Sequence, residues 1–564
     1  MDVPANRAAP LSRQELTWWL VLGAVVLLGL ALRLRGIHDP LLDHPGWRQG
    51  DTAAIARNFA TLDYNPFHPQ TDYNGPPPNY VELELQIVPF LAATLYKLFG
   101  IHEVFGRLLS IAFSLGTIVV LAAFGRWLTN GSAVAGLAAA ALFAVYPGSV
   151  YYGRTFMPDT AMIFFFTAAL YATARWVIDD DQHWRGFWGA ALLTALALLA
   201  KPVAIVALLP MLAIMIAHGG LRRTVSRPQT YAFLALALLP LAAYDHYEAS
   251  IAEWHWASGI TRLHVIPLLV GAFHSWPAMH LKLRIFRQNF HMLPRTLLGP
   301  WCTALFAVAI LASLVRPLGV RSRTLLFAWL VACLIYAFVV MTYERVDYYA
   351  YVVLPLAALW SGAFIHWLVG FVPPEPKWRP ALAAAAVLTV AALAFVNRGP
   401  VRAYYHYDPS VYRRAKALDA TLAPGALVVM GHYDPSILYY INRKGWEEDP
   451  IFWTPFDEQS AIRKGARYFI AVENHRLRHN LELAEWLQRF PLLNPGGKWP
   501  VYETDDAKVL PGAEARWRAF RAREKRLRRH VTAVAAATPP APAASGHAAA
   551  HPTPPVPGSS PDGS

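Results

Sequence analysis

The stretch His44-Pro-Gly-Trp-Arg-Gln-Gly-Asp-Thr-Ala-Ala-Ile-Ala-Arg-Asn-Phe59 is a polar segment that directly follows the first long apolar run. From Asp51 onward, its spacing predicts a helix with an acid in the first turn and one apolar side through Ile55, Phe59 and Leu62. Such a helix in the membrane interface holds a carboxylate at a fixed height. Asp51 is therefore either a functional acid or an acid that interacts with the helix dipole.

The composition of the chain is that of a membrane protein. Of its 564 residues, 55% are hydrophobic and 15% are charged, and the mean hydropathy is +0.30. Soluble globular proteins of this length are less apolar. The net charge of +13 is better explained by membrane topology and anionic lipid than by nucleic acid. Cys302 and Cys333 lie in apolar runs, so we expect buried thiols and no disulfide framework.

Apolar runs of membrane-crossing length recur up to residue 396. The first run, Leu16 to Leu32, has no small-residue cleavage site after it, so we expect a retained helix with a cytoplasmic N-terminus. At ~20 residues per crossing, about eleven transmembrane helices are predicted. The other runs are 108–128, 133–151, 160–177, 186–200, 203–217, 231–244, 303–315, 325–341, 351–371 and 381–396.

The orientation of the later helices depends on the apolar segment from Val81 to Phe99. This segment opens with Glu82 and Glu84 and follows a Pro-rich turn, so we expect it to lie in the interface or re-enter rather than cross. The basic loops at 222–227, 316–323 and 377–379 then fall on the cytoplasmic side, as the positive-inside rule favours. The polar loops after residues 34, 151, 200, 244 and 341 open on the outer side.

The pattern changes after residue 397. Strand-like runs at 426–430 and 468–472 alternate with helical patterns at 412–422, 435–441 and 481–490, which indicates a small α/β domain. With an odd number of crossings, this domain is expected outside, with a role in acceptor binding or packing. Residues 513–530 form an Arg-rich helical pattern, and residues 531–564 are rich in Ala, Pro and Ser and expected to be disordered.

The predicted fold class is therefore an α-helical polytopic membrane protein with a small α/β extramembrane domain near the C-terminus. We expect a transmembrane domain at 1–397 with a long first outer loop at 34–106, an outer α/β domain at 398–512, and a basic helix and tail at 513–564.

Three motifs stand out: an Asp on a helix in the first outer loop, a Pro-rich turn before a helix that ends Tyr96-Lys-Leu-Phe-Gly100, and Arg154-Thr-Phe-Met-Pro-Asp159 in the second outer loop. Together they resemble the GT-C glycosyltransferases, and in particular the protein O-mannosyltransferases and the lipid A aminoarabinose transferases. The resemblance covers roughly the first 370 residues. It implies a GT-C-like fold and an enzyme that uses a sugar linked to a polyprenyl phosphate.

Carried over by position, the resemblance implies that Asp51 is the catalytic aspartate of the first loop. Asp159, as a catalytic residue, and Arg154 match the second-loop motif, and Lys201 and Tyr348 match positions that approach the donor phosphate. Thr52 departs from the family, which usually has Glu there, and Gly75 stands where a Lys is frequent. The acceptor of the better-known members is therefore not transferred to this chain.

The chemistry gives an independent reason for the same residues. An acceptor hydroxyl needs a carboxylate to take its proton, and a departing phosphate needs fixed cationic or hydroxyl donors at the membrane surface. Asp51 is the candidate base in an inverting displacement. Arg154, Lys201, Arg345 and Tyr348 are the candidate donors, and Glu84 is a further candidate for substrate binding. For a lone Lys or Arg at a helix end, reaching the lipid headgroups is the alternative role.

No cofactor is identified with certainty, and a divalent metal ion remains an open possibility. The candidate ligands lack compact spacing, so hydrogen bonding within loops is the alternative role. These candidates are Asp43, His44, Glu82, Glu84 and His246.

We therefore expect a multi-pass hexosyl- or pentosyltransferase of the inner cell membrane, with its active site and α/β domain on the periplasmic face. The expected partners are a polyprenyl-phosphate-linked sugar donor, membrane lipids, and a lipid, glycan or protein acceptor, and no nucleic acid. A transporter or lipid flippase is the alternative from another class, although the chain shows no internal repeat. A ligase or polymerase that uses diphosphate-linked glycans is a further alternative.

Overall fold

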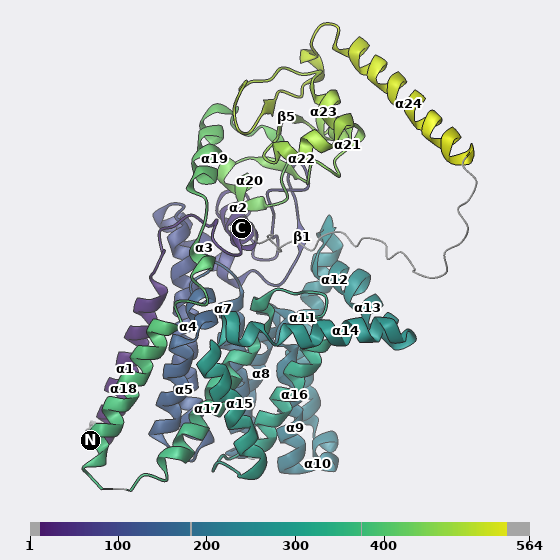
Figure 1. Cartoon of the computed structure of the whole chain (residues 1–564). Helices are drawn as coiled ribbons and strands as arrows, with labels where there is room; N and C mark the ends of the chain where they lie inside the picture. Colours follow the sequence, from purple (N-terminus) through teal and green to yellow (C-terminus); the bar gives the residue numbers. More distant parts are fainter. Residues whose placement is uncertain (1–11, 181–182, 374, 538–564) are drawn as a thin grey trace, which may run out of the picture. The chain divides into compact units, whose positions relative to one another are not determined.

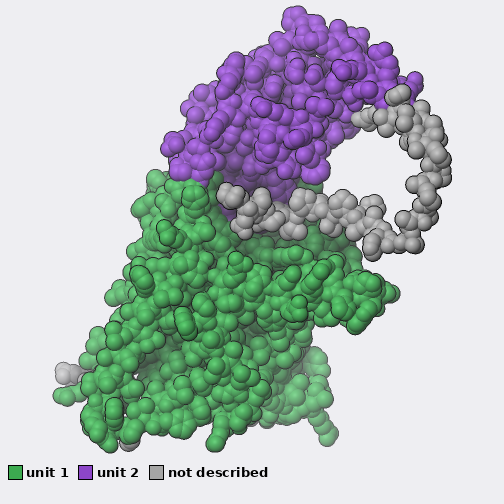
Figure 2. All heavy atoms as spheres, viewed as in Figure 1, with its two compact units in different colours: residues 1–44, 52–70, 80–407 green, residues 45–51, 71–79, 408–564 purple. Residues whose placement is uncertain are grey.

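The computed structural model describes residues 12–180, 183–373 and 375–537. The chain divides into two compact units, which Figure 2 shows in different colours. The first unit takes in residues 1–44, 52–70 and 80–407, and the second takes in 45–51, 71–79 and 408–564. Each unit is thus built from stretches that are separated in the sequence.

The first unit is mostly α-helical (Figure 1). In the described part of the chain, six helical segments are long and apolar enough to cross a membrane: α1 (Arg13–Arg33), α4 (Glu103–Leu128), α7 (Asp159–Ile178), η1 with α9 (Pro202–Gly219), η4 with α17 (Asp347–Val369) and α18 (Trp378–Val396). Shorter apolar helices are α3 (Ile87–Phe99), α5 (Ala133–Val145), α8 (Trp184–Ala200), α15 (Pro300–Val315) and α16 (Arg323–Val339). The multi-pass character is confirmed, and the count of about eleven crossings stays a prediction.

The remaining elements of the first unit are short, apart from α11 and α14. The helical ones are α6 (Pro147–Tyr152), α10 (Leu221–Ser226), α11 (Pro228–Ile251), α12 (Ala257–Ile260), η2 (Thr261–Val265), α13 (Ile266–His274), α14 (Trp276–Asn289), η3 (Leu293–Leu297) and η5 (Ala403–Tyr405). The strands β1 (Val81–Glu82) and β2 (Trp254–His255) form a small parallel pair.

The apolar helices of this unit pack closely side by side. Helix α7 packs against α4 and α8, and α5 packs against α4 and α17. Glycines allow the closest approach, because a Cβ on Gly136 of α5 would lie 2.3 Å from the carbonyl oxygen of Ala122 in α4. Small residues at such crossings are typical of helices that associate in membranes.

Helix α2 spans Gly46–Thr61 and begins earlier than predicted. Pro45 precedes it, and the helix has no acid in its first turn, so the predicted interaction of Asp51 with the helix N-terminus is wrong. Ile55 and Phe59 are buried together as predicted, whereas Leu62 is 52% exposed because the helix ends before it. Asp51 therefore stands on the second turn of an established helix.

Helix α3 occupies only part of the segment that decides the predicted orientation. Residues 81–82 form β1, and α3 has 13 residues, which corresponds to about 20 Å of helix. The apolar core of a bilayer is about 30 Å thick. This length favours the expectation that the segment does not cross, which stays a prediction.

The second unit contains a four-stranded sheet in the order β4-β3-β5-β6. Strand β3 (Leu427–Met430) pairs in parallel with β4 (Lys444–Glu447) and β5 (Ala466–Ile470), and β6 (Val501–Tyr502) runs antiparallel to β5. The helices around it are α19 (Pro409–Thr421), α20 (Pro435–Ile441), α21 (Pro455–Arg463), α22 (Asn474–His479), α23 (Leu481–Leu487) and η6 (Asp506–Lys508). Strand β4 and helix α21 are elements that the sequence analysis did not predict.

Two stretches of the first predicted outer loop belong to this unit. The amide of Gly75 donates to the carbonyl of Gly445 at 2.7 Å, and Lys444 pairs with Asp72 at 3.0 Å. The predicted domain at 398–512 included no part of that loop. The loop residues and the β4 edge of the sheet therefore form one body.

Helix α24 (Ala513–Ala537) carries the predicted Arg-rich run. It continues past His530 to Ala537, into the first residues of the stretch for which disorder is predicted. The remainder of the predicted tail, 538–564, lies outside the described residues.

Candidate active site

The predicted site residues fall into both units. Asp51 belongs to the second unit, and the first unit holds Glu84, Arg154, Asp159, Lys201, Arg345 and Tyr348. Within the first unit, the structure brings together Asp159, Lys201 and Tyr348.

Lys201 and Asp159 form a buried ion pair, with Lys201 Nζ 2.7 Å from Asp159 Oδ1. Pro202 follows Lys201 and keeps it out of helical geometry, with φ −168° and ψ 128° at the end of α8. Asp159 is the first residue of α7, directly after Pro158. The start of α7 and the end of α8, each next to a proline, thus place Asp159 and Lys201 in contact.

Two aromatic rings lie close to the Lys201 ammonium. Its Nζ lies 5.0 Å from the ring centroid of Tyr348 and 4.8 Å from that of Tyr349. Tyr348 is 2% exposed and lies in η4, immediately before the apolar helix α17. A desolvated cation over aromatic faces is stabilised by their quadrupoles. The group has the charge, the hydroxyls and the apolar setting that suit a phosphate carried by a lipid.

Asp347 adds a network that the sequence analysis did not assign. Tyr404 donates to Asp347 Oδ2 at 2.7 Å, and Tyr152 donates to Oδ1. His44 lies 4.0 Å from the same carboxylate and packs on Tyr404, and burial lowers its pKa. The only sequence signal was the position of Asp347 beside Tyr348 in a polar run before an apolar helix.

Arg154 lies in a different environment from Lys201. It is fully buried, pairs with Asp43, and packs its guanidinium 4.5 Å from the ring centroid of Tyr405. Burial acts to lower the pKa of Arg154, but the Asp43 carboxylate raises it overall. The predicted contact of Arg154 with the donor phosphate would therefore compete with an existing ion pair.

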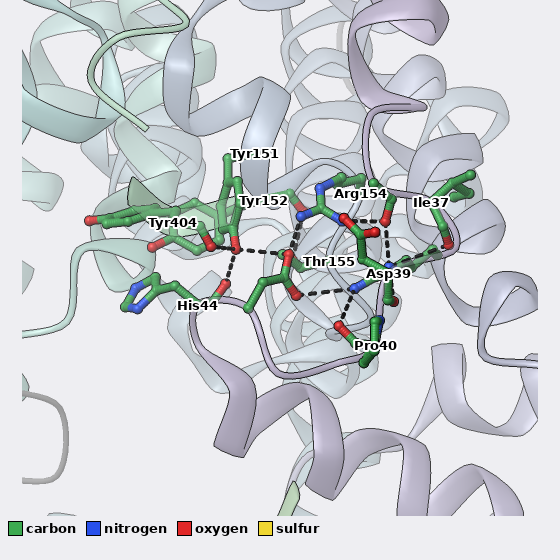
Figure 3. Close-up of polar contacts among 12 residues, drawn as sticks. Ile37, Asp39, Pro40, His44, Tyr151, Tyr152, Arg154, Thr155 and Tyr404 are labelled. Carbon is green, nitrogen blue, oxygen red and sulfur yellow. Dashed lines mark hydrogen bonds and ion pairs between the residues drawn. The ribbon is translucent and has the colours of Figure 1, made fainter. Parts of the chain in front are cut away.

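Arg107 completes this enclosed network, part of which Figure 3 shows around Tyr151 and Arg154. Arg107 pairs with Asp43 Oδ1 at 3.1 Å and donates to the carbonyls of residues 36, 37, 39 and 40. Tyr151 donates to Asp43 Oδ2 at 3.2 Å. The network fastens the turn after α1 to helices α4 and α6.

Arg345 and Glu84 are the two remaining candidates for substrate binding in the first unit. Arg345 is exposed, on the segment before η4. Glu84 is buried, and its backbone carbonyl accepts hydrogen bonds from Gln86 at 2.7 Å and from Tyr244 at 3.4 Å. Their predicted roles in substrate binding stay predictions.

Two of the candidate metal ligands, Asp43 and Glu82, have other partners. Asp43 is held by two guanidinium groups, and Glu82 accepts from Ser258 at 2.7 Å and lies 3.2 Å from His255. Among the described residues, no group of three or more His, Cys, Asp or Glu side chains is arranged to hold a metal ion. A metal site at these residues remains a prediction without a geometric basis.

Asp51 is buried in the second unit, with Arg48 and Tyr73 as partners. Arg48 Nη1 lies 3.1 Å from Asp51 Oδ2, one helical turn away. The Tyr73 hydroxyl hydrogen-bonds to the Asp51 carboxylate, and burial together with that carboxylate raises the pKa of Tyr73. A cation and a phenol that both hold a carboxylate fix its orientation for proton transfer.

The sequence of residues 86–244 matches the family described as dolichyl-phosphate-mannose-protein mannosyltransferase. This match covers less than a third of the 564 residues. No curated protein sequence matches the chain significantly.

The fold is similar to that of ArnT from Cupriavidus metallidurans. With ArnT bound to undecaprenyl phosphate, the TM-score is 0.56 at 14% identity, over 88% of this chain and 99% of that chain. With apo ArnT, the TM-score is 0.53 at 14% identity, over 88% of this chain and 100% of that chain. The resemblance to the GT-C glycosyltransferases is confirmed by the family match and by this fold.

Proposed function

We propose that this chain is a GT-C-type membrane glycosyltransferase that moves a sugar from a polyprenyl-phosphate donor to an acceptor in the cell envelope. The observation that carries the proposal is the buried Lys201–Asp159 pair beneath Tyr348 and Tyr349, at the ends of apolar helices. The family match and the fold shared with an undecaprenyl-phosphate-binding protein support it. A lipid-linked phosphate needs a cation at this kind of position.

In the proposed reaction, Asp51 takes the proton of the acceptor hydroxyl as the hydroxyl oxygen attacks the anomeric carbon of the sugar. The bond between that carbon and the phosphate oxygen breaks, and its electron pair leaves on the polyprenyl phosphate. Lys201 and the Tyr348 hydroxyl stabilise the negative charge that develops on this phosphate. Asp159 acts as a positioning residue, because its carboxylate holds the Lys201 ammonium. Attack opposite the leaving group inverts the anomeric centre.

The site is proposed to face the outer side of the inner membrane. Basic residues at 222–227, 316–323 and 377–379 support this orientation through the positive-inside rule. A cysteine placed at Ser226 in a background without Cys302 and Cys333 should stay unlabelled by an impermeant reagent in intact cells, whereas one at the exposed Ala507 should react. The reverse pattern would contradict the orientation and leave the chemistry to be tested separately.

The activity is tested with purified protein and a polyprenyl-phosphate sugar that is labelled in the sugar. A glycosyltransferase should release polyprenyl phosphate and transfer the label to a hydroxyl acceptor. An intact donor that only changes leaflet would identify a lipid transporter and contradict the proposal. Consumption of a diphosphate-linked donor alone would identify a ligase or polymerase.

Asp51→Asn tests the base. Loss of a general base lowers turnover by about 10²–10⁴-fold, while donor binding and folding should change little. Donor affinity is measured separately on the folded variant. Turnover equal to that of the wild type would exclude Asp51 as the base.

A further inference from the structure

The backbone around Asp51 is fitted closely to the C-terminal part of the second unit. A Cβ on Gly50 would lie 2.4 Å from Cα of Ser436, which is in the first turn of α20. Contacts this short are essentially absent for real Cβ atoms, so position 50 must be glycine or the two helices must separate. Gly50, the residue immediately before Asp51, is therefore in direct contact with helix α20.

A second stretch of the same loop follows the outer edge of β4. Gly75 pairs with Gly445, the amide of Gly445 donates to the carbonyl of Asp72 at 3.0 Å, and Lys444 Nζ reaches Asp72 Oδ1. Tyr73, the residue after Asp72, is 5% exposed. These contacts place Tyr73 between α2 and the strand that ends in Glu447.

The environment of Tyr73 shows which charges surround it. After burial, the strongest influences on its pKa are the Asp51 and Glu447 carboxyl groups, which raise it, and Arg48, which lowers it. Side chains of α2, of the loop and of β4 therefore lie within electrostatic reach of one another. They form a cluster of Arg48, Asp51, Tyr73 and Glu447.

Glu447 is the acid in this cluster for which the described residues supply no cation. The residue is half-buried, and its Oε2 is buried and has no hydrogen-bond partner within the described part of the chain. Burial raises the pKa of Glu447 well above its usual range, and the acids that face it, Asp51, Asp434 and Glu448, raise it further. An ionised and unpaired carboxylate in such a place is costly, so the neutral form is favoured.

We propose that Glu447 is a positioning residue for Asp51. Glu447 stays a neutral carboxylic acid in the same cluster, so that the two carboxyl groups together carry a single negative charge. This inference rests on the proposed role of Asp51 as the base. The charge stays on Asp51 because Arg48 and Tyr73 hold that carboxylate and not Glu447. A pair of close carboxyl groups titrates in two separate steps, and the intermediate state is the active one.

The first experiment measures kcat/KM against pH for the wild type, for Glu447→Gln and for the exposed-acid control Asp506→Asn. Gln has the shape of the neutral acid but cannot ionise. The wild type should lose activity on the alkaline side as Glu447 ionises, and Glu447→Gln should shift that limb to higher pH by a unit or more. Asp506→Asn should keep the limb of the wild type. An alkaline limb that Glu447→Gln leaves in place would overturn the inference.

The second experiment needs no activity. The infrared carbonyl band of a protonated carboxylic acid at neutral pH should be weaker in Glu447→Gln than in the wild type. In Asp51→Asn, the Glu447 band should disappear at a lower pH, because the neighbouring charge is gone. An unchanged band in both variants would overturn the inference.

The two proposals fail in distinguishable ways. If Asp51→Asn is inactive while Glu447→Gln keeps the pH profile and the carbonyl band of the wild type, the function stands and the inference fails. If Asp51→Asn turns over like the wild type, the proposed base fails, whatever the infrared result.

Discussion

Arg154 and Lys201 are both buried cations that pair with a buried aspartate, yet their surroundings differ. The Arg154 side chain is 0% exposed and is enclosed by Asp43, Tyr151 and Tyr405. The Lys201 side chain is 7% exposed and has one ion pair and two aromatic neighbours at a broken helix end. Because Arg154 and Asp159 come from one short motif, the comparison shows that such a motif can supply a structural ion pair and a candidate phosphate site.

The largest effect should come from the enclosed network. Arg107→Met removes one of the two guanidinium partners of Asp43 and takes away the Arg107 donor from several backbone carbonyls. Removing one partner of a buried pair destabilises by about 3–5 kcal/mol. We expect a marked loss of folded protein, measured by thermal unfolding in detergent. Stability equal to that of the wild type would show that the network does not hold the turn after α1.

A smaller effect should separate the two cations. Lys201→Ala removes a charged hydrogen-bond donor and should weaken binding of the sugar donor by about 1.5–3 kcal/mol, or roughly 10- to 150-fold. Arg154→Ala should instead reduce the yield of folded protein, and its folded fraction should bind donor nearly as the wild type does. Donor affinity is measured for both variants on folded protein. If Arg154→Ala lost as much donor affinity as Lys201→Ala, the contact of Arg154 with the donor phosphate that was predicted from the sequence would be supported.

The smallest effect concerns a buried acid of the second unit that has no ion pair among the described residues. Glu458 accepts from Trp453 Nε1 at 2.7 Å, and burial raises its pKa from 4.5 to about 8. Between these values the folded state keeps a proton that the unfolded chain has released. Stability from this group is therefore present below about pH 4.5 and declines as the pH rises towards 8.

This decline is at most about 1.4 kcal/mol per pH unit. Glu458→Gln cannot ionise and should flatten the stability of the folded protein between pH 6 and pH 7. The measurement is thermal unfolding across that range, with the exposed acid Asp506 changed to Asn as the control. A pH dependence of stability that survives in Glu458→Gln would show that another group causes it.

The sequence predicted the apolar helices well, because their signal is local. Periodicity and length place α1, α4 and α7 close to their observed bounds. It placed the start of the helix at Asp51 too late, because an acid in a first turn and an acid in a second turn give similar patterns. Strand β4 was missed because its charged residues suit an edge strand, where pairing and not apolarity defines the strand.

The candidate site was predicted in its members but not in their partners. Lys201, Asp159 and Tyr348 were named from motifs, and the structure brings them together. The attachment of Arg154 to Asp43, and the place of Glu447 beside Asp51, depend on residues that are more than a hundred positions apart. A contact between residues so far apart produces no motif with a fixed spacing, so it cannot be recognised in a single sequence.

The ion pair between Asp72 and Lys444 joins residues that are 372 positions apart. At synthesis rates of about 5–20 residues per second, a ribosome needs roughly 20–75 s to travel between them. During that time Asp72 lacks its partner Lys444, while the apolar helices between the two residues are being inserted. The cluster of Arg48, Asp51, Tyr73 and Glu447 is therefore complete only late in synthesis, and a chain released before residue 447 would lack the Glu447 neighbour of Asp51.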